Sequence, residues 1–134
     1  MKKSFVLFVI FQVVTFAYAQ QPASAGGEPV VLEAKAFQAA FAKDTGAVLL
    51  DVRTPAEVKA GIIPGAMAID YNAPDFGSRI SKLDKNKPYF VYCKGGGRSS
   101  RAVEQMSKAG FKKLYVLKNG YDDWVDLGLP TRKP

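Results

Sequence analysis

Short apolar runs alternate with segments of helical spacing along most of this chain. Compact apolar runs at 47–52 and 89–92 lack polar alternation, which is typical of strands buried in a parallel sheet, and shorter runs at 66–69 and 114–117 are also predicted as strands. The predicted helices are residues 32–43, 54–59, 76–83, 99–109 and 121–127. Because strands alternate with helices through short connections, the pattern predicts an α/β fold: a single domain with a small parallel β-sheet flanked by helices on both faces.

Two of the predicted helices carry local signals that define them further. Thr54 has the side chain of an N-cap, Pro55 follows at the first helical position, and Glu57 stands three residues after the cap, so the three form a capping box. This capping role is sufficient to explain Glu57. In the last helix we expect Trp124 to belong to the core, because the helix also places Tyr121 and Val125 inward and a lone tryptophan needs no ligand to account for it.

The chain begins with the pattern of a secretory signal peptide. Lys2 and Lys3 precede an apolar run at 5–16, and residues 17–19 (Ala-Tyr-Ala) have the small-x-small pattern of a cleavage site. The alternative, an uncleaved membrane anchor, needs ~20 apolar residues, which this stretch does not supply. We therefore expect an exported protein, periplasmic or secreted, with no stable membrane anchor after cleavage. The predicted parts are a signal peptide at 1–19, a flexible mature N-terminus at 20–29 and the domain at 30–132.

The composition excludes several kinds of chemistry. The 134 residues include no histidine and one cysteine, which rules out Ser-His-Asp and Cys-His nucleophile pairs, histidine-containing metal sites, thiolate cages and an intrachain disulfide. We accordingly expect no metal and no cofactor. The net charge is +7, but the lysines are scattered without a basic helix, so we expect a solvated surface and no nucleic-acid partner.

The single cysteine occupies a position suited to chemistry. Cys93 comes directly after the predicted strand 89–92, at the carboxyl end where open α/β sheets bind ligands. The residues that follow it and lead into the next helix are Lys94, Gly95, Gly96, Gly97, Arg98 and Ser99. A glycine-rich turn at a helix N-terminus lets backbone N–H groups point into one concavity, which stabilises an anion. The turn and the nearby cations thus predict a lowered pKa for the Cys93 thiol; the alternative is a small buried hydrophobe.

Four ordered motifs resemble those of the rhodanese-like family. Residues 93–99 (C-K-G-G-G-R-S) are similar to its active-site loop C-x-x-G-x-R-S, and residues 51–57 (D-V-R-T-P-A-E) to its D-V-R-x-x-x-E segment. Residues 61–66 (G-I-I-P-G-A) resemble G-H-I-P-G-A, with Ile62 where histidine usually stands. The closing motif G-F…L-x-G-G…W…G-L-P is matched from 110 to 130, with Asn119 in place of the first glycine.

This resemblance implies a rhodanese-like fold and a sulfurtransferase that works through a Cys93 persulfide. The thiolate would take sulfane sulfur from a small anionic donor such as thiosulfate and pass it to a thiol, cyanide or a protein cysteine. The loop from Lys94 to Ser99 would cradle the anion, and Arg98 and Lys94 are the candidates for contact with the donor's oxygen atoms. Thiolate–sulfur exchange of this kind needs a thiol of low pKa and no proton shuttle.

Asp51 and Arg53 resemble signature residues of the family, and we interpret them as structural support. An acid and a base at the end of a buried strand more often fix a neighbouring loop by ion pairing than take part in a reaction. We therefore expect them to hold the edge of the sheet together rather than to contact substrate.

Three rival functions follow from other classes of protein. A cysteine phosphatase uses a C-x5-R loop, whereas only four residues separate Cys93 from Arg98, and the loop contains no carboxylate to serve as general acid. A redox protein would need a second, resolving cysteine. A non-enzymatic sulfur-carrier or partner-binding module would keep the same fold, because fold alone does not determine function.

Overall fold

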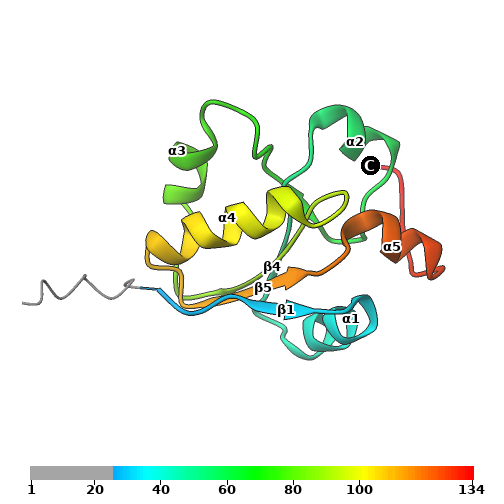
Figure 1. Cartoon of the computed structure of the whole chain (residues 1–134), viewed down its shortest axis with the longest axis horizontal. Helices are drawn as coiled ribbons and strands as arrows, with labels where there is room; N and C mark the ends of the chain where they lie inside the picture. Colours follow the sequence, from blue (N-terminus) through cyan, green and yellow to red (C-terminus); the bar gives the residue numbers. More distant parts are fainter. Residues whose placement is uncertain (1–25) are drawn as a thin grey trace, which may run out of the picture.

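Five parallel strands form the centre of the molecule, and four of them lie at the apolar runs that predict strands. The computed structural model describes residues 26–134 (Figure 1). The strands are β1 (Val30–Leu32), β2 (Val48–Asp51), β3 (Met67–Ala68), β4 (Pro88–Tyr92) and β5 (Lys113–Leu117). Their order in the sheet is β1-β5-β4-β2-β3, and every pairing is parallel, which confirms the predicted fold class.

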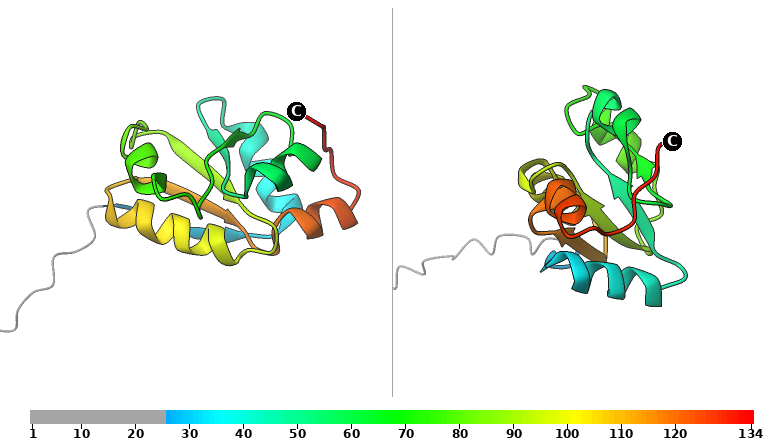
Figure 2. Two further views of the ribbon diagram at one scale, coloured as in Figure 1. Left: turned by 90° about the horizontal axis from the view of Figure 1, so that it is seen from above. Right: turned by 90° about the vertical axis from the view of Figure 1, so that its right-hand side faces the viewer.

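Helices cover both faces of this sheet. They are α1 (Ala34–Lys43), α2 (Pro55–Ala60), α3 (Phe76–Ser81), α4 (Gly97–Lys108) and α5 (Gly120–Asp126). One apolar cluster joins α3 and α4 to residues such as Leu50 and Val91, and a second joins α1 and α5 to Leu49 and Phe90. Successive side chains of a strand point to opposite faces, so neighbouring strand residues enter different clusters. The sheet lies between α1 and α4 in Figure 1, and Figure 2 gives two further views of the same arrangement.

The structure differs from the sequence-based expectation at two elements. Leu32, predicted to begin a helix, instead ends the short edge strand β1, and the helix starts at Ala34. In α5, Trp124 is buried and contacts Phe37 at a centroid distance of 6.5 Å, but Val125 is 47% exposed. The expectation for Val125 was wrong because the next residue on a helix lies about 100° around its axis.

The amino-terminal part of the described chain is anchored to the domain. Gly27 donates its backbone N–H to the carbonyl oxygen of Phe111 at 2.9 Å and accepts a hydrogen bond from Ser107 at 2.8 Å. The predicted signal peptide at 1–19 and residues 20–25 lie outside the described residues. From residue 26 onward, no helix is long and apolar enough to cross a membrane.

The carboxyl ends of β2 and β4 bring the sequence-predicted residues to one edge. These two strands are direct neighbours, and Asp51 pairs in register with Tyr92. Cys93 therefore emerges beside the segment 51–57, although about forty residues separate the two in the chain. This edge is where the candidate site lies.

Candidate active site

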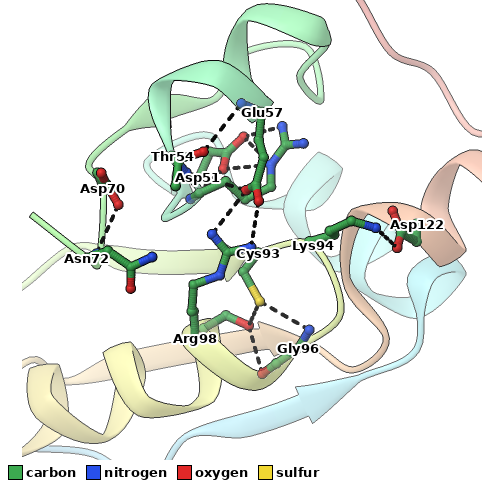
Figure 3. Close-up of polar contacts among 12 residues, drawn as sticks. Asp51, Thr54, Glu57, Asp70, Asn72, Cys93, Lys94, Gly96, Arg98 and Asp122 are labelled. Atoms are coloured by element: carbon green, nitrogen blue, oxygen red, sulfur yellow. Dashed lines mark hydrogen bonds and ion pairs between the residues drawn. The ribbon is translucent and has the colours of Figure 1, made fainter.

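Cys93 is buried under the loop that leads into α4. The residue is 1% exposed, and its sulfur belongs to the cluster on the α4 face of the sheet. The backbone N–H of Gly96 donates to Sγ at 3.1 Å, and the Ser99 hydroxyl lies 3.2 Å from the same atom (Figure 3). The loop thus turns its polar groups inward onto the sulfur, as the glycine-rich sequence predicts.

Gly96 is required in this loop by the backbone geometry. Its φ of +107° lies in the left-handed region that side chains rarely adopt, and a Cβ there would meet the carbonyl oxygen of Lys118 at 2.3 Å. Gly95 and Gly97 have open space around the position of a Cβ. The three glycines are therefore not equivalent, and only the middle one allows the close approach to β5.

The beginning of α5 holds the other side of the loop. The N–H groups of Tyr121 and Asp122 donate to the carbonyl oxygens of Cys93 and Lys94 at 2.8 Å and 3.1 Å. Gly120 permits this approach, since a Cβ at that position would lie 2.3 Å from the Lys94 oxygen. With the carbonyl groups bound to α5, the amide groups of the loop are left free to face the sulfur.

The hydrogen bonds to the sulfur determine the direction in which the pKa of the Cys93 thiol is shifted. Burial by itself raises the pKa of Cys93, because a charged group is less stable away from water. Hydrogen bonds from the Ser99 hydroxyl and from the backbone amides of Ser99, Gly96 and Gly95 outweigh burial and lower the pKa below its ordinary value. The lowered pKa agrees with the sequence prediction, and the hydrogen bonds of the turn are its largest favourable causes. A thiolate held in this way is a nucleophile that needs no separate base.

Glu57 is a residue of the site that the sequence analysis assigned to capping alone. The capping box is present, with Thr54 and Glu57 exchanging hydrogen bonds of 3.4 Å. The same carboxylate also accepts two hydrogen bonds from Arg98, at 3.0 Å and 3.1 Å, and this ion pair is half-buried (Figure 3). The signal that could have revealed the pair is topological, because residues that follow two neighbouring parallel strands meet at one edge.

Lys94, the second predicted cation of the loop, points away from the sulfur. Its ammonium group forms an ion pair of 2.5 Å with Asp122 of α5, and both side chains are exposed. Figure 3 shows this pair to one side of the site, whereas Arg98 lies between Glu57 and Cys93. The loop therefore presents one cation near the sulfur and one at the surface, each already bound to a carboxylate.

Asp51 and Arg53 form a buried ion pair at the carboxyl end of β2. The Arg53 guanidinium donates to both carboxylate oxygens of Asp51, at 2.7 Å for the shortest contact, and to the carbonyl oxygen of Gly61 at 2.6 Å. It also lies 4.0 Å from the centroid of the Tyr121 ring. Burial lowers the pKa of Arg53, but the hydrogen bonds and charge of Asp51 more than offset this and raise it. The pair joins the end of β2 to the segment after α2 and to α5.

Comparisons with known proteins agree with this geometry. The family model described as "Rhodanese-like domain" matches residues 33–127. A protein of Allochromatium vinosum named "Sulfurtransferase" is 28% identical over 77% of this chain and 94% of its own length. The "Thiosulfate sulfurtransferase GlpE" of Stutzerimonas stutzeri is 33% identical over 65% of this chain and 78% of its own. The crystal structure of a rhodanese-related protein from Thermoplasma volcanium superposes with a TM-score of 0.69 at 27% identity, covering 78% of this chain and 99% of that one.

Proposed function

The chain belongs to the rhodanese-like domain family, and from this premise we propose that it is a sulfurtransferase in which Cys93 carries sulfane sulfur as a persulfide. One observation carries the proposal. The sulfur of the only cysteine receives a backbone hydrogen bond from Gly96 and lies within hydrogen-bond distance of the Ser99 hydroxyl, which together favour its anionic form. The relatives named as sulfurtransferases support the same class of reaction.

The first step is attack of the Cys93 thiolate on the outer sulfur of a donor such as thiosulfate. A bond forms between the two sulfur atoms, the donor's S–S bond breaks, and sulfite leaves with the electron pair. The negative charge then lies on the outer sulfur of the persulfide. It is stabilised by the backbone amides of the loop residues Lys94, Gly95, Gly96, Gly97, Arg98 and Ser99. A thiol, cyanide or a protein cysteine then removes that sulfur and restores the thiolate. No proton shuttle is needed, which fits a chain without histidine.

The test is the intact mass of the protein before and after exposure to a donor. Incubation with thiosulfate or polysulfide is expected to add one sulfur, about 32 Da, and cyanide is expected to remove it. The Cys93→Ser variant should gain nothing. If the wild-type protein, with its thiolate shown to be ionised, gains no sulfur from either donor, the proposed activity is wrong.

A sulfur-carrier or partner-binding module is the alternative within the same family. A carrier would also form the Cys93 persulfide, so mass alone does not separate it from an enzyme. Steady-state formation of thiocyanate from thiosulfate and cyanide separates an enzyme from a carrier that a partner protein loads, because the enzyme reloads from thiosulfate and turns over many times, whereas such a carrier releases only the one sulfur that it already holds.

We propose in addition that the protein is exported, to the periplasm or the medium, on the basis of the pattern at residues 1–19. Expression of the full chain with its first residues intact, followed by cell fractionation and sequencing of the N-terminus, tests this. An N-terminus at Gln20 in the exported fraction is the expected result, and full-length protein retained inside the cell would contradict it.

A further inference from the structure

A surface cavity of about 280 Å³ lies between α2 and α3, beside the edge strand β3. Its apolar walls are Pro55 and Val58 of α2, Ala68 of β3 and Pro134 of the carboxyl-terminal segment. None of the residues that line it belongs to the loop 93–99, so the cavity is separate from the Cys93 site. At a share of about 30 Å³ for each water molecule, it has room for roughly nine waters or for an organic ligand of similar size.

Arg53 supplies a buried donor to this cavity. Its side chain is 3% exposed; Nε and Nη2 donate to Asp51, and Nη2 also donates to the carbonyl oxygen of Gly61. The remaining nitrogen, Nη1, carries two N–H groups and makes no hydrogen bond to any of residues 26–134. No fully buried side-chain nitrogen or oxygen in this part of the chain lacks a partner, so Nη1 must reach accessible space, and Arg53 lines the cavity. The inner wall of the cavity therefore offers an unpaired donor on a cation.

Two further cations stand at the rim of the cavity. Lys59 of α2 and Arg79 of α3 are exposed, and the side chain of neither forms an ion pair or a hydrogen bond with another described residue. One carboxylate, that of Asp70, also lines the cavity; its Oδ1 accepts the backbone N–H of Asn72 at 2.9 Å, and it pairs with neither cation. Cations that line one cavity repel one another, and a bound anion relieves this repulsion.

We propose that this cavity is a second ligand site of the protein, which binds a small organic monocarboxylate. One carboxylate oxygen accepts a hydrogen bond from Arg53 Nη1, while Lys59 and Arg79 supply compensating charge at the rim. The apolar body of the ligand packs against Val58 and the other apolar walls, which a bare inorganic ion would leave exposed to water. Asp70 favours a monoanion, because it repels a dianion more strongly. The site does not depend on the persulfide chemistry, so its failure would leave the proposed function intact.

The test is a titration with benzoate, a monocarboxylate on a compact apolar ring, followed by the backbone amide signals in heteronuclear NMR spectra. The protein carries no tag after Pro134, because that residue lines the cavity. Benzamide is the matched control ligand, since it has the same ring and nearly the same shape without the charge. Inorganic phosphate at the same ionic strength tests whether the site prefers a tetrahedral anion.

The main variant is the double substitution Lys59→Gln with Arg79→Gln, which removes both rim cations and leaves the buried arginine in place. Lys35→Gln with Lys43→Gln is the matched control variant. It makes the same change in charge at two exposed positions of α1, a helix that contributes no residue to the cavity.

We expect benzoate to shift the amide signals of Val58, Lys59 and Ala68 until they saturate, with a Kd of about 1 mM, which is typical of so small a ligand. The double variant should raise this Kd by about fivefold or more through the loss of two exposed charge pairs, and the control variant should leave it unchanged. Benzamide should bind at least about fivefold more weakly than benzoate. As a second variant, Ala68→Leu fills the cavity from β3 without changing any charge and should abolish binding.

Several results would overturn the inference. It is wrong if the shifts do not saturate, if the double variant and the control variant have the same Kd, or if benzamide binds as tightly as benzoate. It is also wrong if inorganic phosphate binds at the same amides more tightly than benzoate, because the cavity would then take a tetrahedral anion. Shifts centred on the loop 93–99 and reversed by thiosulfate would place benzoate at the Cys93 site, which would refute a second site and leave the proposed function standing.

Discussion

Replacing Ser99 with alanine removes the interaction that contributes most to the low pKa of Cys93, together with the 3.1 Å hydrogen bond from the same hydroxyl to the carbonyl oxygen of Gly96. The Ser99 hydroxyl lies 3.2 Å from the sulfur and is the first of the hydrogen bonds that lower the pKa against the opposing effect of burial. Alanine keeps the backbone N–H of position 99 and the N–H of Gly96, and it leaves the sulfur as buried as before. The variant therefore removes one stabilising contact to the thiolate and keeps the cost of burial.

The size of the effect follows from the energy of a hydrogen bond to a charged group. Such a bond contributes about 1.5–3 kcal/mol, and one pH unit corresponds to about 1.4 kcal/mol, so Ser99→Ala should raise the pKa of Cys93 by about 1–2 units. The sign is upward because the lost bond favoured the deprotonated form. At a pH below the thiol's pKa, the thiolate fraction should fall by about tenfold or more.

The assay is the rate of alkylation of Cys93 by iodoacetamide as a function of pH, with the ultraviolet absorbance of the thiolate as an independent readout. Ser100→Ala is the matched control, since Ser100 donates to the carbonyl oxygen of Gly96 at 2.7 Å and makes no contact with the sulfur. It should leave the pKa of Cys93 unchanged. Equal midpoints for wild type and Ser99→Ala, with both proteins folded, would refute the assignment of the low pKa to this hydroxyl.

Three further predictions test the rest of the site. Gly96→Ala should destabilise the fold by at least about 1–2 kcal/mol, because the φ of position 96 is left-handed and a Cβ there would meet the carbonyl oxygen of Lys118. Gly95→Ala is the control and should have little effect on the melting temperature, since a Cβ at position 95 meets open space. Asp51→Asn should lower the free energy of unfolding by about 3–5 kcal/mol, measured by urea denaturation, since it leaves the buried Arg53 charge uncompensated; an effect below about 1 kcal/mol would contradict this. Folding lowers the pKa of Cys93, so the free energy of unfolding of the wild type relative to Cys93→Ser should increase as the pH rises through the pKa of the folded protein. The difference should become constant above about 8.5, the pKa of an unfolded cysteine. A difference that does not depend on pH would show that the thiol is unperturbed.

Local sequence patterns were sufficient to predict most of the sheet and the placement of the loop. The run at 89–92 and the glycines after Cys93 define a buried strand, a turn and a helix start that depend on neighbouring residues only, and the structure has all three. β1 escaped prediction because three residues directly before a helix carry too little periodicity to distinguish them from it. Its pairing with β5 depends on residues more than eighty positions away, which no local pattern contains.

The charges of the site were harder to predict than its nucleophile. The sequence places Arg98 and Lys94 beside Cys93, and on that basis both were expected to attract the donor. Their partners, Glu57 and Asp122, come from other elements that the fold brings to the same edge. Whether a cation is free or paired depends on tertiary contacts, so the sequence could locate these charges but not their state.

The contact between α5 and the loop also determines when the thiol becomes reactive. The N–H groups of Tyr121 and Asp122 hold the loop carbonyls, and Lys118 packs against Gly96, so the last part of the domain to be synthesised completes the environment of the sulfur. In a chain that still lacks these residues, the loop carbonyls have no partners in α5, and we expect the thiol to keep the ordinary pKa of an unfolded cysteine, mostly protonated at neutral pH. We therefore expect Cys93 to become strongly nucleophilic only after α5 has docked, and to be less prone to modification before then.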